Sequence, residues 1–126
     1  MPAIPETPLR IVVAGCGAMA GAWVEYALAR PDCRIVGLVD LDLAAANRMA
    51  EKYQLTDAVV GRDLAAVLEA TRASLVFNLA IPAAHRSIAL TAFAAGCAVL
   101  GEKPLASTLD EADEMIRAAR ERNLPF

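Results

Sequence analysis

Five short apolar runs alternate with longer amphipathic segments along this 126-residue chain, and no other feature constrains its fold as strongly. The runs are rich in aliphatic residues and almost free of charge, which is typical of strands buried on both faces of a sheet. They occupy residues 9–15, 34–40, 57–61, 74–82 and 97–101. Parallel strands need crossover connections, and helical crossovers cover both faces of the sheet. The alternation therefore predicts a single-domain α/β fold with a doubly wound parallel sheet.

The segments between these runs carry helix signals. After the first run, apolar residues recur at helical spacing and predict a buried face made of Met19, Ala22, Trp23, Tyr26 and Ala27. Asp42 stands where it can cap the next helix. Thr108 and Glu111 form an S/T-x-x-E capping box that predicts the start of the last helix. Ligands of such sheets bind outside the carboxyl ends of the strands, here residues 15–20, 40–42, 61–62, 79–85 and 101–104.

Charge and composition exclude several classes of function. The chain has 12 basic and 15 acidic residues, with no Lys/Arg run that would bind a nucleic acid or an anionic membrane. Its first ten residues, MPAIPETPLR, lack the apolar segment of a signal peptide, and no apolar run is long enough to span a membrane. The three cysteines are isolated, so neither a disulfide framework nor a metal site is predicted. We expect a cytoplasmic protein that binds small molecules, with residues 1–8 as an N-terminal extension and 9–126 as the domain.

The first strand exit carries the stretch GCGAMAG, residues 15–21. Gly15, Gly17 and Ala20 fit the pattern G-x-G-x-x-G/A, which binds a dinucleotide when it follows a strand and opens a helix. The first glycine allows a tight turn, the second lets a pyrophosphate approach the backbone, and the alanine allows close helix–strand packing. Without that context the glycines would indicate only a turn. Because free N–H groups at a helix start bind phosphate, the predicted cofactor-binding residues here are Gly15, Cys16, Gly17, Ala18 and Met19.

Asp40 ends the second apolar run. A carboxylate at this position can accept hydrogen bonds from the hydroxyls of an adenosine ribose, and it repels a 2′-phosphate. No Arg or Lys follows it in DLDLA, so NAD(H) is favoured over NADP(H). Two other interpretations stay open. One is a strand-end or helix-cap carboxylate, a role that fits Asp42 better, and the other is the ribose-binding acid of a methyltransferase.

The fourth exit carries the only histidine, His85, in the stretch AIPAAH. A lone histidine early in a helix is structural as often as functional, and its place at the ligand edge of the sheet favours function. Asn78 lies within the preceding run and is expected to be a hydrogen-bonded core amide. His85 is therefore a candidate site residue, and Asn78 is not.

Glu102 and Lys103 stand side by side at the fifth exit, in VLGEKPLAST. Pro104 restricts Lys103 to extended conformations, so the amine is presented from a stiff segment. A lysine in a partly buried crevice is a candidate general acid or base. The alternative is an exposed Glu–Lys pair at a strand end, which contributes little.

The ordered segments VVAGCGAMAG, VGLVD and AIPAAH, followed by ALTAFAAGCAVLGEKPLASTLDEADEMIRAA, resemble the N-terminal domain of the Gfo/Idh/MocA oxidoreductases. This family includes glucose–fructose oxidoreductase and inositol dehydrogenase. The resemblance runs from about Leu9 onward, and its specific part is the E-K-P signature followed by LA and a capped helix. It implies a Rossmann domain that binds NAD(P), followed by a C-terminal domain that binds a sugar or polyol.

The resemblance also implies roles for single residues. In the family the lysine of E-K-P, here Lys103, lies near nicotinamide and substrate as the catalytic acid or base, and Glu102 contacts the nicotinamide ribose. The loop that lines the cofactor is matched here by Leu79, Ala80, Pro82 and His85. Ile81 and Ala83 stand where many relatives have a small hydroxyl residue and an asparagine, so fewer side-chain hydrogen bonds are expected in this loop.

The implied reaction is hydride transfer between a carbinol carbon of the substrate and C4 of nicotinamide. The implied substrate domain is absent from this chain, so we expect the chain to bind the cofactor and to be inactive alone. Its last helix and sheet edge would then lack cover, and homo-oligomer formation through that edge is a further expectation. Two alternatives stay open: an NAD-dependent glycosidase or lyase, which would turn over without releasing NADH, and a non-catalytic NAD-binding or sensing module.

Overall fold

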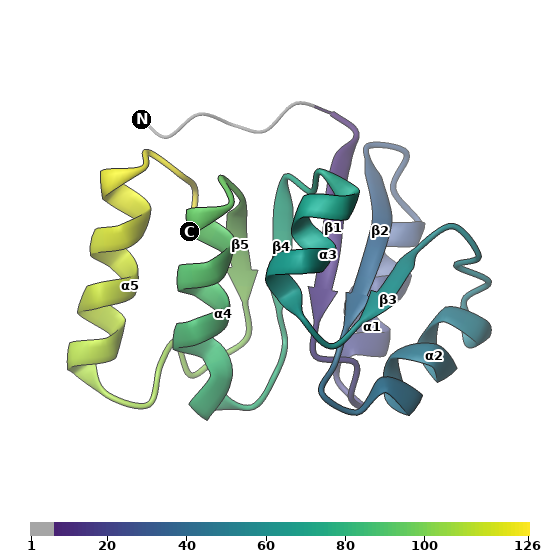
Figure 1. The fold of residues 1–126 in the computed structure, drawn as a ribbon, viewed down its shortest axis with the longest axis horizontal. Coiled ribbons are helices and arrows are strands. Elements are labelled where there is room, and N and C mark those ends of the chain that lie inside the picture. The colour runs from purple at the N-terminus through teal and green to yellow at the C-terminus, as the bar shows by residue number, and fades with distance from the viewer. Residues whose placement is uncertain (1–6) are drawn as a thin grey trace.

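The computed structural model describes residues 7–126, whose five strands form one parallel sheet (Figure 1). The strands are β1 (Leu9–Ala14), β2 (Cys33–Val39), β3 (Val59–Gly61), β4 (Leu75–Asn78) and β5 (Ala98–Gly101). Their order across the sheet is β3-β2-β1-β4-β5. The connections therefore change direction between β1 and β4, and ligands of such sheets bind at this switch point. Of the predicted N-terminal extension, residues 1–6 lie outside the described residues.

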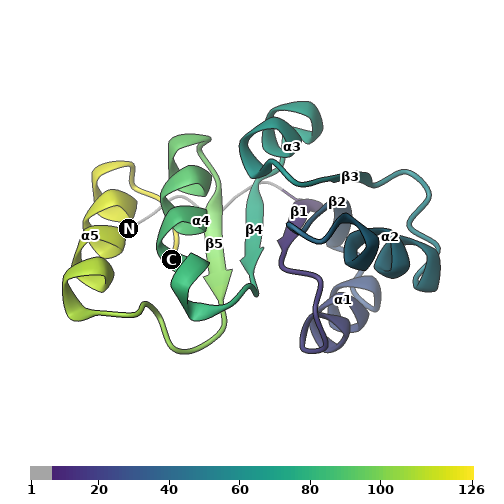
Figure 2. The same ribbon diagram turned by 60° about the horizontal axis from the view of Figure 1, so that its bottom comes forward.

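Five helices cover the two faces of this sheet. They are α1 (Ala20–Leu28), α2 (Leu43–Lys52), α3 (Leu64–Thr71), α4 (Pro82–Ala94) and α5 (Leu109–Glu121). Helices α1 and α2 pack on one face, and α3, α4 and α5 pack on the other (Figure 2). The predicted doubly wound α/β fold is thus confirmed. Within residues 7–126, no helix has the length and apolar character needed to cross a membrane.

The central strand β1 is apolar from Ile11 to Ala14 because both of its faces are buried there. Ile11 and Val13 belong to the core cluster under α1 and α2, whereas Val12 and Ala14 belong to the cluster on the opposite face. All four side chains are at most 1% exposed. Successive side chains of a strand point to opposite faces, so each face of β1 needs its own helical cover. Burying an aliphatic side chain of this size contributes roughly 1.5–3 kcal/mol.

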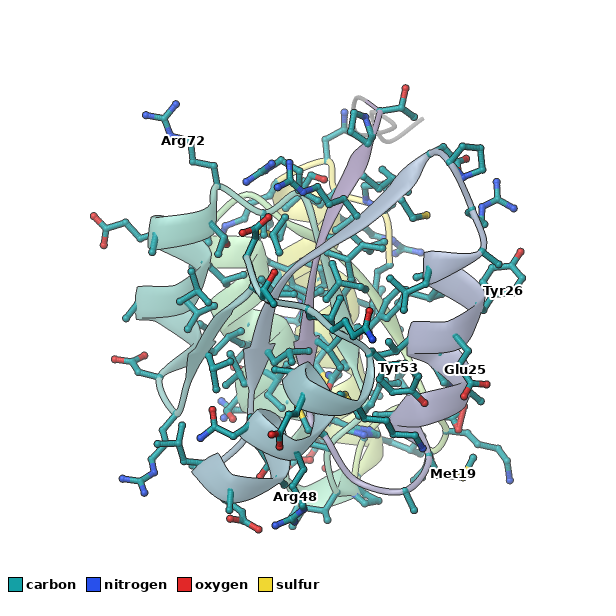
Figure 3. The ribbon with its side chains drawn as sticks, turned by 90° about the vertical axis from the view of Figure 1, so that its right-hand side faces the viewer. Met19, Glu25, Tyr26, Arg48, Tyr53 and Arg72 are labelled. Atoms are coloured by element: carbon teal, nitrogen blue, oxygen red, sulfur yellow. The ribbon has the colours of Figure 1, made fainter. Side chains whose placement is uncertain are left out.

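Helix α1 buries only part of the predicted face: Ala27 is buried and Trp23 half-buried, as predicted, whereas Ala22 is exposed. Its buried residues are Ala20, Val24 and Ala27. Met19 and Tyr26, which were expected in the core, are 62% and 65% exposed, and Figure 3 shows both near the outer side of the helix. The helix is rotated so that Trp23 meets Phe77 of β4 edge-on, with ring centroids 5.1 Å apart.

The fourth strand is shorter than the predicted run of residues 74–82. Strand β4 ends at Asn78, and the N–H of Leu79 then donates to the Ala14 carbonyl at 2.8 Å. Pro82 begins α4, a position that suits proline because the first helical N–H has no partner in the helix. Residues 79–81 therefore form a short loop at the ligand edge, and the apolar character of that loop is not explained by burial in a strand.

The predicted helix caps of α2 and α5 are present. The Asp42 carboxylate accepts a hydrogen bond from the Ala44 N–H at 3.1 Å. The Thr108 hydroxyl accepts one from the Glu111 N–H at 3.1 Å, while the Glu111 carboxylate accepts from the Ser107 N–H at 3.2 Å. The return bond of the box thus reaches one residue before Thr108. Both caps lie at the ligand edge of the sheet and define how the chain enters each helix.

Candidate functional site

The turn between β1 and α1 depends on the glycine at position 15. Gly15 has a φ of +101°, a conformation that L residues rarely adopt. A Cβ at this position would lie 2.5 Å from the backbone nitrogen of Ala80 and 2.6 Å from the carbonyl carbon of Leu79. The missing side chain therefore lets the glycine turn pack directly against the β4–α4 loop. Two of the predicted ligand segments are in contact for this reason.

Gly17 faces open space. A Cβ built on it would meet no atom within 4 Å. Gly17 lines both of two cavities, of about 610 and 460 Å³, that lie at the carboxyl ends of the strands. Cys16 and Ala18 line the first cavity, Gly15 lines the second, and Met19 lines neither. Backbone at the start of α1 is therefore open to a ligand on both sides of Gly17.

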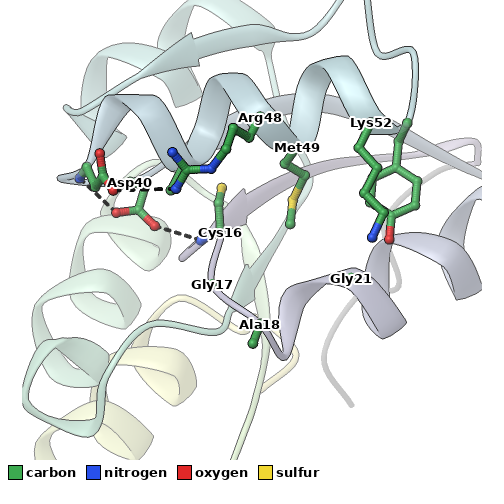
Figure 4. Close-up of a pocket in the computed structure, with 11 residues that line it drawn as sticks. Cys16, Gly17, Ala18, Gly21, Asp40, Arg48, Met49 and Lys52 are labelled. Carbon is green, nitrogen blue, oxygen red and sulfur yellow. Dashed lines mark hydrogen bonds and ion pairs between the residues drawn. The ribbon is translucent and has the colours of Figure 1, made fainter.

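Asp40 lines both cavities. Figure 4 shows it in the first one, beside the glycine turn. Its Oδ2 accepts a hydrogen bond from the Cys16 N–H at 2.8 Å, and its Oδ1 accepts one from the Asp42 N–H at 2.8 Å. One carboxylate thus joins the glycine turn to the start of α2. Each carboxylate oxygen has a further lone pair for a ligand. Asp40 is consequently both a structural acceptor and a half-buried anion facing the cavities.

Two cationic side chains of α2 complete the first cavity, and the sequence reasoning missed them. Arg48 and Lys52 line it together with Asp40 and Asp42. The nearest guanidinium nitrogen of Arg48 lies 3.8 Å from the Asp42 carboxylate. Helical spacing from the Asp42 cap would have placed residues 45, 48, 49 and 52 on one stripe of α2. Arg48 lies one helical turn beyond the segment DLDLA, residues 40–44, which contains no cation.

The second cavity has a mostly apolar wall. Leu64, Leu79 and Ile88 line its interior, and Arg62 lines it from the end of β3. Leu41 and Ile81 also line it, although they are 85% and 71% exposed. Two large aliphatic side chains in water at the mouth of a cavity indicate a surface that a flat apolar group would cover. Neither residue was singled out from the sequence as a contact.

His85 lies behind this wall rather than in it. The side chain is 2% exposed and lines neither cavity. Its Nδ1 is 2.7 Å from the Pro104 carbonyl oxygen, and its Nε2 is 2.8 Å from the Ala80 carbonyl oxygen. The structure therefore brings His85 next to two predicted ligand segments through their backbone, while its ring does not face the space where a cofactor would lie.

The expectation that Asn78 is fully hydrogen-bonded is only half right. Its Nδ2 donates to the His85 carbonyl at 2.9 Å. Its Oδ1 is buried, and no donor among the described residues reaches it. The neighbouring position on β5 is Gly101, which has no side chain to supply a donor. Asn78 nevertheless holds the start of α4 against the end of β4.

Glu102 and Lys103 follow β5 at the same edge of the sheet. The Glu102 N–H donates to the Asn78 carbonyl at 3.1 Å, which ties the end of β5 to the end of β4. Lys103 is exposed and makes no ion pair within residues 7–126. Neither residue lines the two cavities. The lysine is therefore free to meet a group that approaches from outside the described chain.

The cysteines have no features of reactive thiols. Burial, together with the charge of Asp40, raises the pKa of the Cys16 thiol to about 12. Burial raises the pKa of Cys97 to about 11. Across residues 7–126, histidine, cysteine and acidic side chains form no group of three or more that could hold a metal ion. Cys16 therefore acts in the glycine turn as a hydrogen-bond donor, through its backbone N–H to Asp40 and its buried Sγ to the Val39 carbonyl at 3.6 Å.

Alkylation of the native protein at pH 8 is expected to modify Cys33 before Cys16 and Cys97. Burial and Asp32 raise the pKa of Cys33 as well, but this side chain is only half-buried and reagent can reach it. With a pKa of about 12, roughly one Cys16 in ten thousand is ionised at pH 8. Mass spectrometry after iodoacetamide treatment measures the order, with the urea-unfolded chain as control. Equal rates for Cys16 and Cys33 in the native chain would contradict the packed turn.

Comparison with known proteins relates this edge of the sheet to a family. A sequence profile of the oxidoreductases with an NAD-binding Rossmann fold, GFO_IDH_MocA, matches residues 9–126. D-glucoside 3-dehydrogenase of Escherichia coli (strain K12) is 35% identical over 119 residues, which cover 94% of this chain and 33% of that protein.

Solved structures agree with this relationship. A dehydrogenase from Chromobacterium violaceum superposes with a TM-score of 0.86 and 28% identity, over 94% of this chain and 34% of that one. A 3-ketoreductase from Actinomadura kijaniata in complex with NADP superposes with a TM-score of 0.81 and 28% identity, over 93% of this chain and 37% of that one. This chain therefore spans about a third of the length of each of these relatives.

The matched region contains every feature of the ligand edge. It includes the glycine turn, Asp40, the β4–α4 loop and the segment after β5, in an unbroken match from β1 through α5. The chain belongs to the GFO_IDH_MocA oxidoreductase family, and residues 9–126 form its NAD-binding Rossmann domain.

Proposed function

We propose that this domain binds NAD(H) as the cofactor half of an enzyme that oxidises a sugar-like hydroxyl group or reduces the corresponding carbonyl. The observation that carries the proposal is the open backbone at Gly17, which lies between two cavities with the Asp40 carboxylate at their junction. A backbone free of side chains at a helix start suits a pyrophosphate. A carboxylate beside it suits the ribose hydroxyls.

The residues present fit a nicotinamide dinucleotide. The N–H groups of Gly17, Ala18 and Met19 at the start of α1 would hold the pyrophosphate. Asp40 would accept from the adenosine ribose with the lone pairs that its two backbone bonds leave free. Leu41 and Ile81 would cover the faces of the adenine ring, which explains two exposed aliphatic side chains at the cavity mouth.

We propose NAD(H) as the preferred form of the cofactor, because the Asp40 carboxylate repels a 2′-phosphate on the ribose that it binds. Arg48 and Lys52 in the same cavity reduce this repulsion, and Arg48 is partly engaged with Asp42. The related 3-ketoreductase binds NADP, so a domain of this fold can also hold the phosphorylated cofactor. We therefore expect NADH to bind more tightly than NADPH, with NADPH still binding measurably.

Lys103 is the proposed acid or base of the reaction. When bound, nicotinamide supplies the hydride acceptor or donor. Lys103 would take the proton of the substrate hydroxyl as hydride leaves its carbon, and return it in the reverse direction. Glu102, half-buried beside it, would accept from the nicotinamide ribose. The exposure of Lys103 supports this role, since a substrate must reach it from outside the domain. D-glucoside 3-dehydrogenase and the 3-ketoreductase support a sugar-like substrate.

NADH is expected to bind this chain, and ADP-ribose is expected to compete with it. The proposal assigns most contacts to the adenosine and pyrophosphate half, which the two ligands share. Fluorescence titration of NADH, with ADP-ribose as competitor, measures both affinities. A chain that is folded by circular dichroism and yet binds neither ligand at millimolar concentration would contradict the proposed function.

A further inference from the structure

One buried ring lies between the loop that lines the cofactor cavity and the loop that carries Lys103. The two ring nitrogens of His85 are within 2.8 Å of carbonyl oxygens, Ala80 on one side and Pro104 on the other. Ala80 lines the second cavity, and Pro104 directly follows Lys103. The geometry of both cavities leaves this ring unexplained, because it faces neither.

The two loops depend on this ring to different degrees. The β4–α4 loop is held without it, since the Leu79 N–H donates to the Ala14 carbonyl and the glycine turn packs against the loop backbone. The β5–α5 loop has fewer contacts. Between residues 103 and 106, the hydrogen bond of Pro104 to His85 is the only one that the described part of the chain makes. Losing the ring would therefore free the Lys103 loop first.

The two acceptors define which ring nitrogen of His85 must carry a hydrogen for each contact. A carbonyl oxygen only accepts, so a ring nitrogen that bonds it must carry a hydrogen. Holding Pro104 requires the hydrogen on Nδ1, and holding Ala80 requires it on Nε2. A neutral ring carries only one of these hydrogens, so it donates to one of the two oxygens at a time. The amide nitrogen of asparagine lies near the place of Nδ1, and that of glutamine near the place of Nε2. The two contacts can thus be removed one at a time.

We propose that His85 is a positioning residue that holds Lys103 at the nicotinamide end of the site, through the bond from its Nδ1–H to the Pro104 carbonyl. This inference rests on the proposed role of Lys103 beside nicotinamide. His85 touches no reacting atom and acts through the loop alone. Its loss should weaken contacts to the nicotinamide half of the cofactor and spare those to the adenosine half.

His85→Gln is expected to weaken NADH binding about fivefold, the equivalent of one hydrogen bond, with no change for ADP, which lacks both nicotinamide and the ribose attached to it. His85→Asn retains a donor toward Pro104 and should bind NADH within about twofold of the unmodified chain, less than the effect of one lost bond. Fluorescence titration gives the NADH affinities, and calorimetry gives those for ADP. Arg86→Gln is the matched control. It removes the solvent-facing ion pair with Glu114 that joins α4 to α5, and it leaves the contacts of the His85 ring intact.

Equal losses for NADH and ADP in His85→Gln would show a merely structural role and overturn the proposal. An unchanged NADH affinity in that variant, or a larger loss in His85→Asn, would overturn it as well. An unmodified chain that folds and binds neither ligand would instead contradict the proposed function. The two failures are therefore distinguishable.

A second measurement needs neither a variant nor a ligand. Because the chain has one histidine, a ¹⁵N-histidine label reports on His85 alone. We expect a scalar coupling across the hydrogen bond, from a ring nitrogen to the carbonyl carbon of Pro104. A coupling to Ala80 alone, or none at all, would overturn the positioning role even if both variants fail to fold.

Discussion

Gly15→Ala is expected to lower the free energy of unfolding by about 2–6 kcal/mol and to abolish NADH binding. A φ of +101° strains any residue with a Cβ by about 1–3 kcal/mol. That Cβ would also lie 2.5 Å from the Ala80 nitrogen, and such overpacking costs a further 1–3 kcal/mol or so. The clashing atoms are backbone, so the glycine turn and the β4–α4 loop would have to separate. Urea unfolding and NADH titration measure the two effects.

Gly17→Ala is the matched control, two residues away in the same turn. Its Cβ would meet no atom within 4 Å, so the free energy of unfolding should change by less than about 1 kcal/mol. NADH binding should nevertheless weaken strongly, because the methyl group would occupy the space left for the pyrophosphate. Destabilisation as large as that of Gly15→Ala would contradict the open geometry of this turn. Unchanged NADH affinity would contradict the assigned pyrophosphate site.

Asp40→Ala is expected to weaken NADH binding about 10- to 100-fold, since a hydrogen bond to a charged group contributes about 1.5–3 kcal/mol. NADPH binding should fall less or rise, because the repulsion of its 2′-phosphate disappears. The unmodified chain should bind NADH more tightly than NADPH, and the ratio of the two affinities should be smaller in the variant. Parallel fluorescence titrations of NADH and NADPH measure this ratio. Equal affinity for the two cofactors in the unmodified chain would contradict the role given to Asp40.

Asp42→Ala controls for charge in this experiment. It removes a second carboxylate from the first cavity but leaves the ribose acceptor in place. It also removes the cap of α2, which should cost about 1 kcal/mol of stability. Asp40→Ala leaves the N–H groups of Cys16 and Asp42 without their acceptor. Both variants should therefore be less stable than the unmodified chain. Thermal unfolding curves show at which temperature both are still folded, and binding is compared at that temperature.

Much of the fold and part of the site could be predicted from short windows of sequence. The apolar run over residues 9–15 defines a strand buried on both faces, and the glycines after it define the turn. Asp40 was found because it directly ends a strand. In each case the signal lies within one element and its exit, where local conformation and periodicity decide the structure.

Other features could not be predicted because they depend on how helices rotate and pack. The predicted buried face of α1 was right for Ala27 and wrong for Met19 and Tyr26, because the rotation of this helix depends on contacts with distant strands, such as that of Trp23 with Phe77. Helical spacing places Arg48 and Lys52 on one stripe of α2, but it does not report that this stripe borders the cavity of Asp40. That depends on how α2 packs in the tertiary structure.

The sequence by itself determined the parallel α/β fold, the ligand edge and the residues at its exits, because strand periodicity, turn glycines and helix caps act over a few residues. Only the tertiary structure decided what those residues touch. His85 is the clearest case: its position marked the ligand edge, but its bonds to Ala80 and Pro104 exist because α4 packs between two loops. Contacts between segments 19 residues apart depend on packing, which no local pattern encodes.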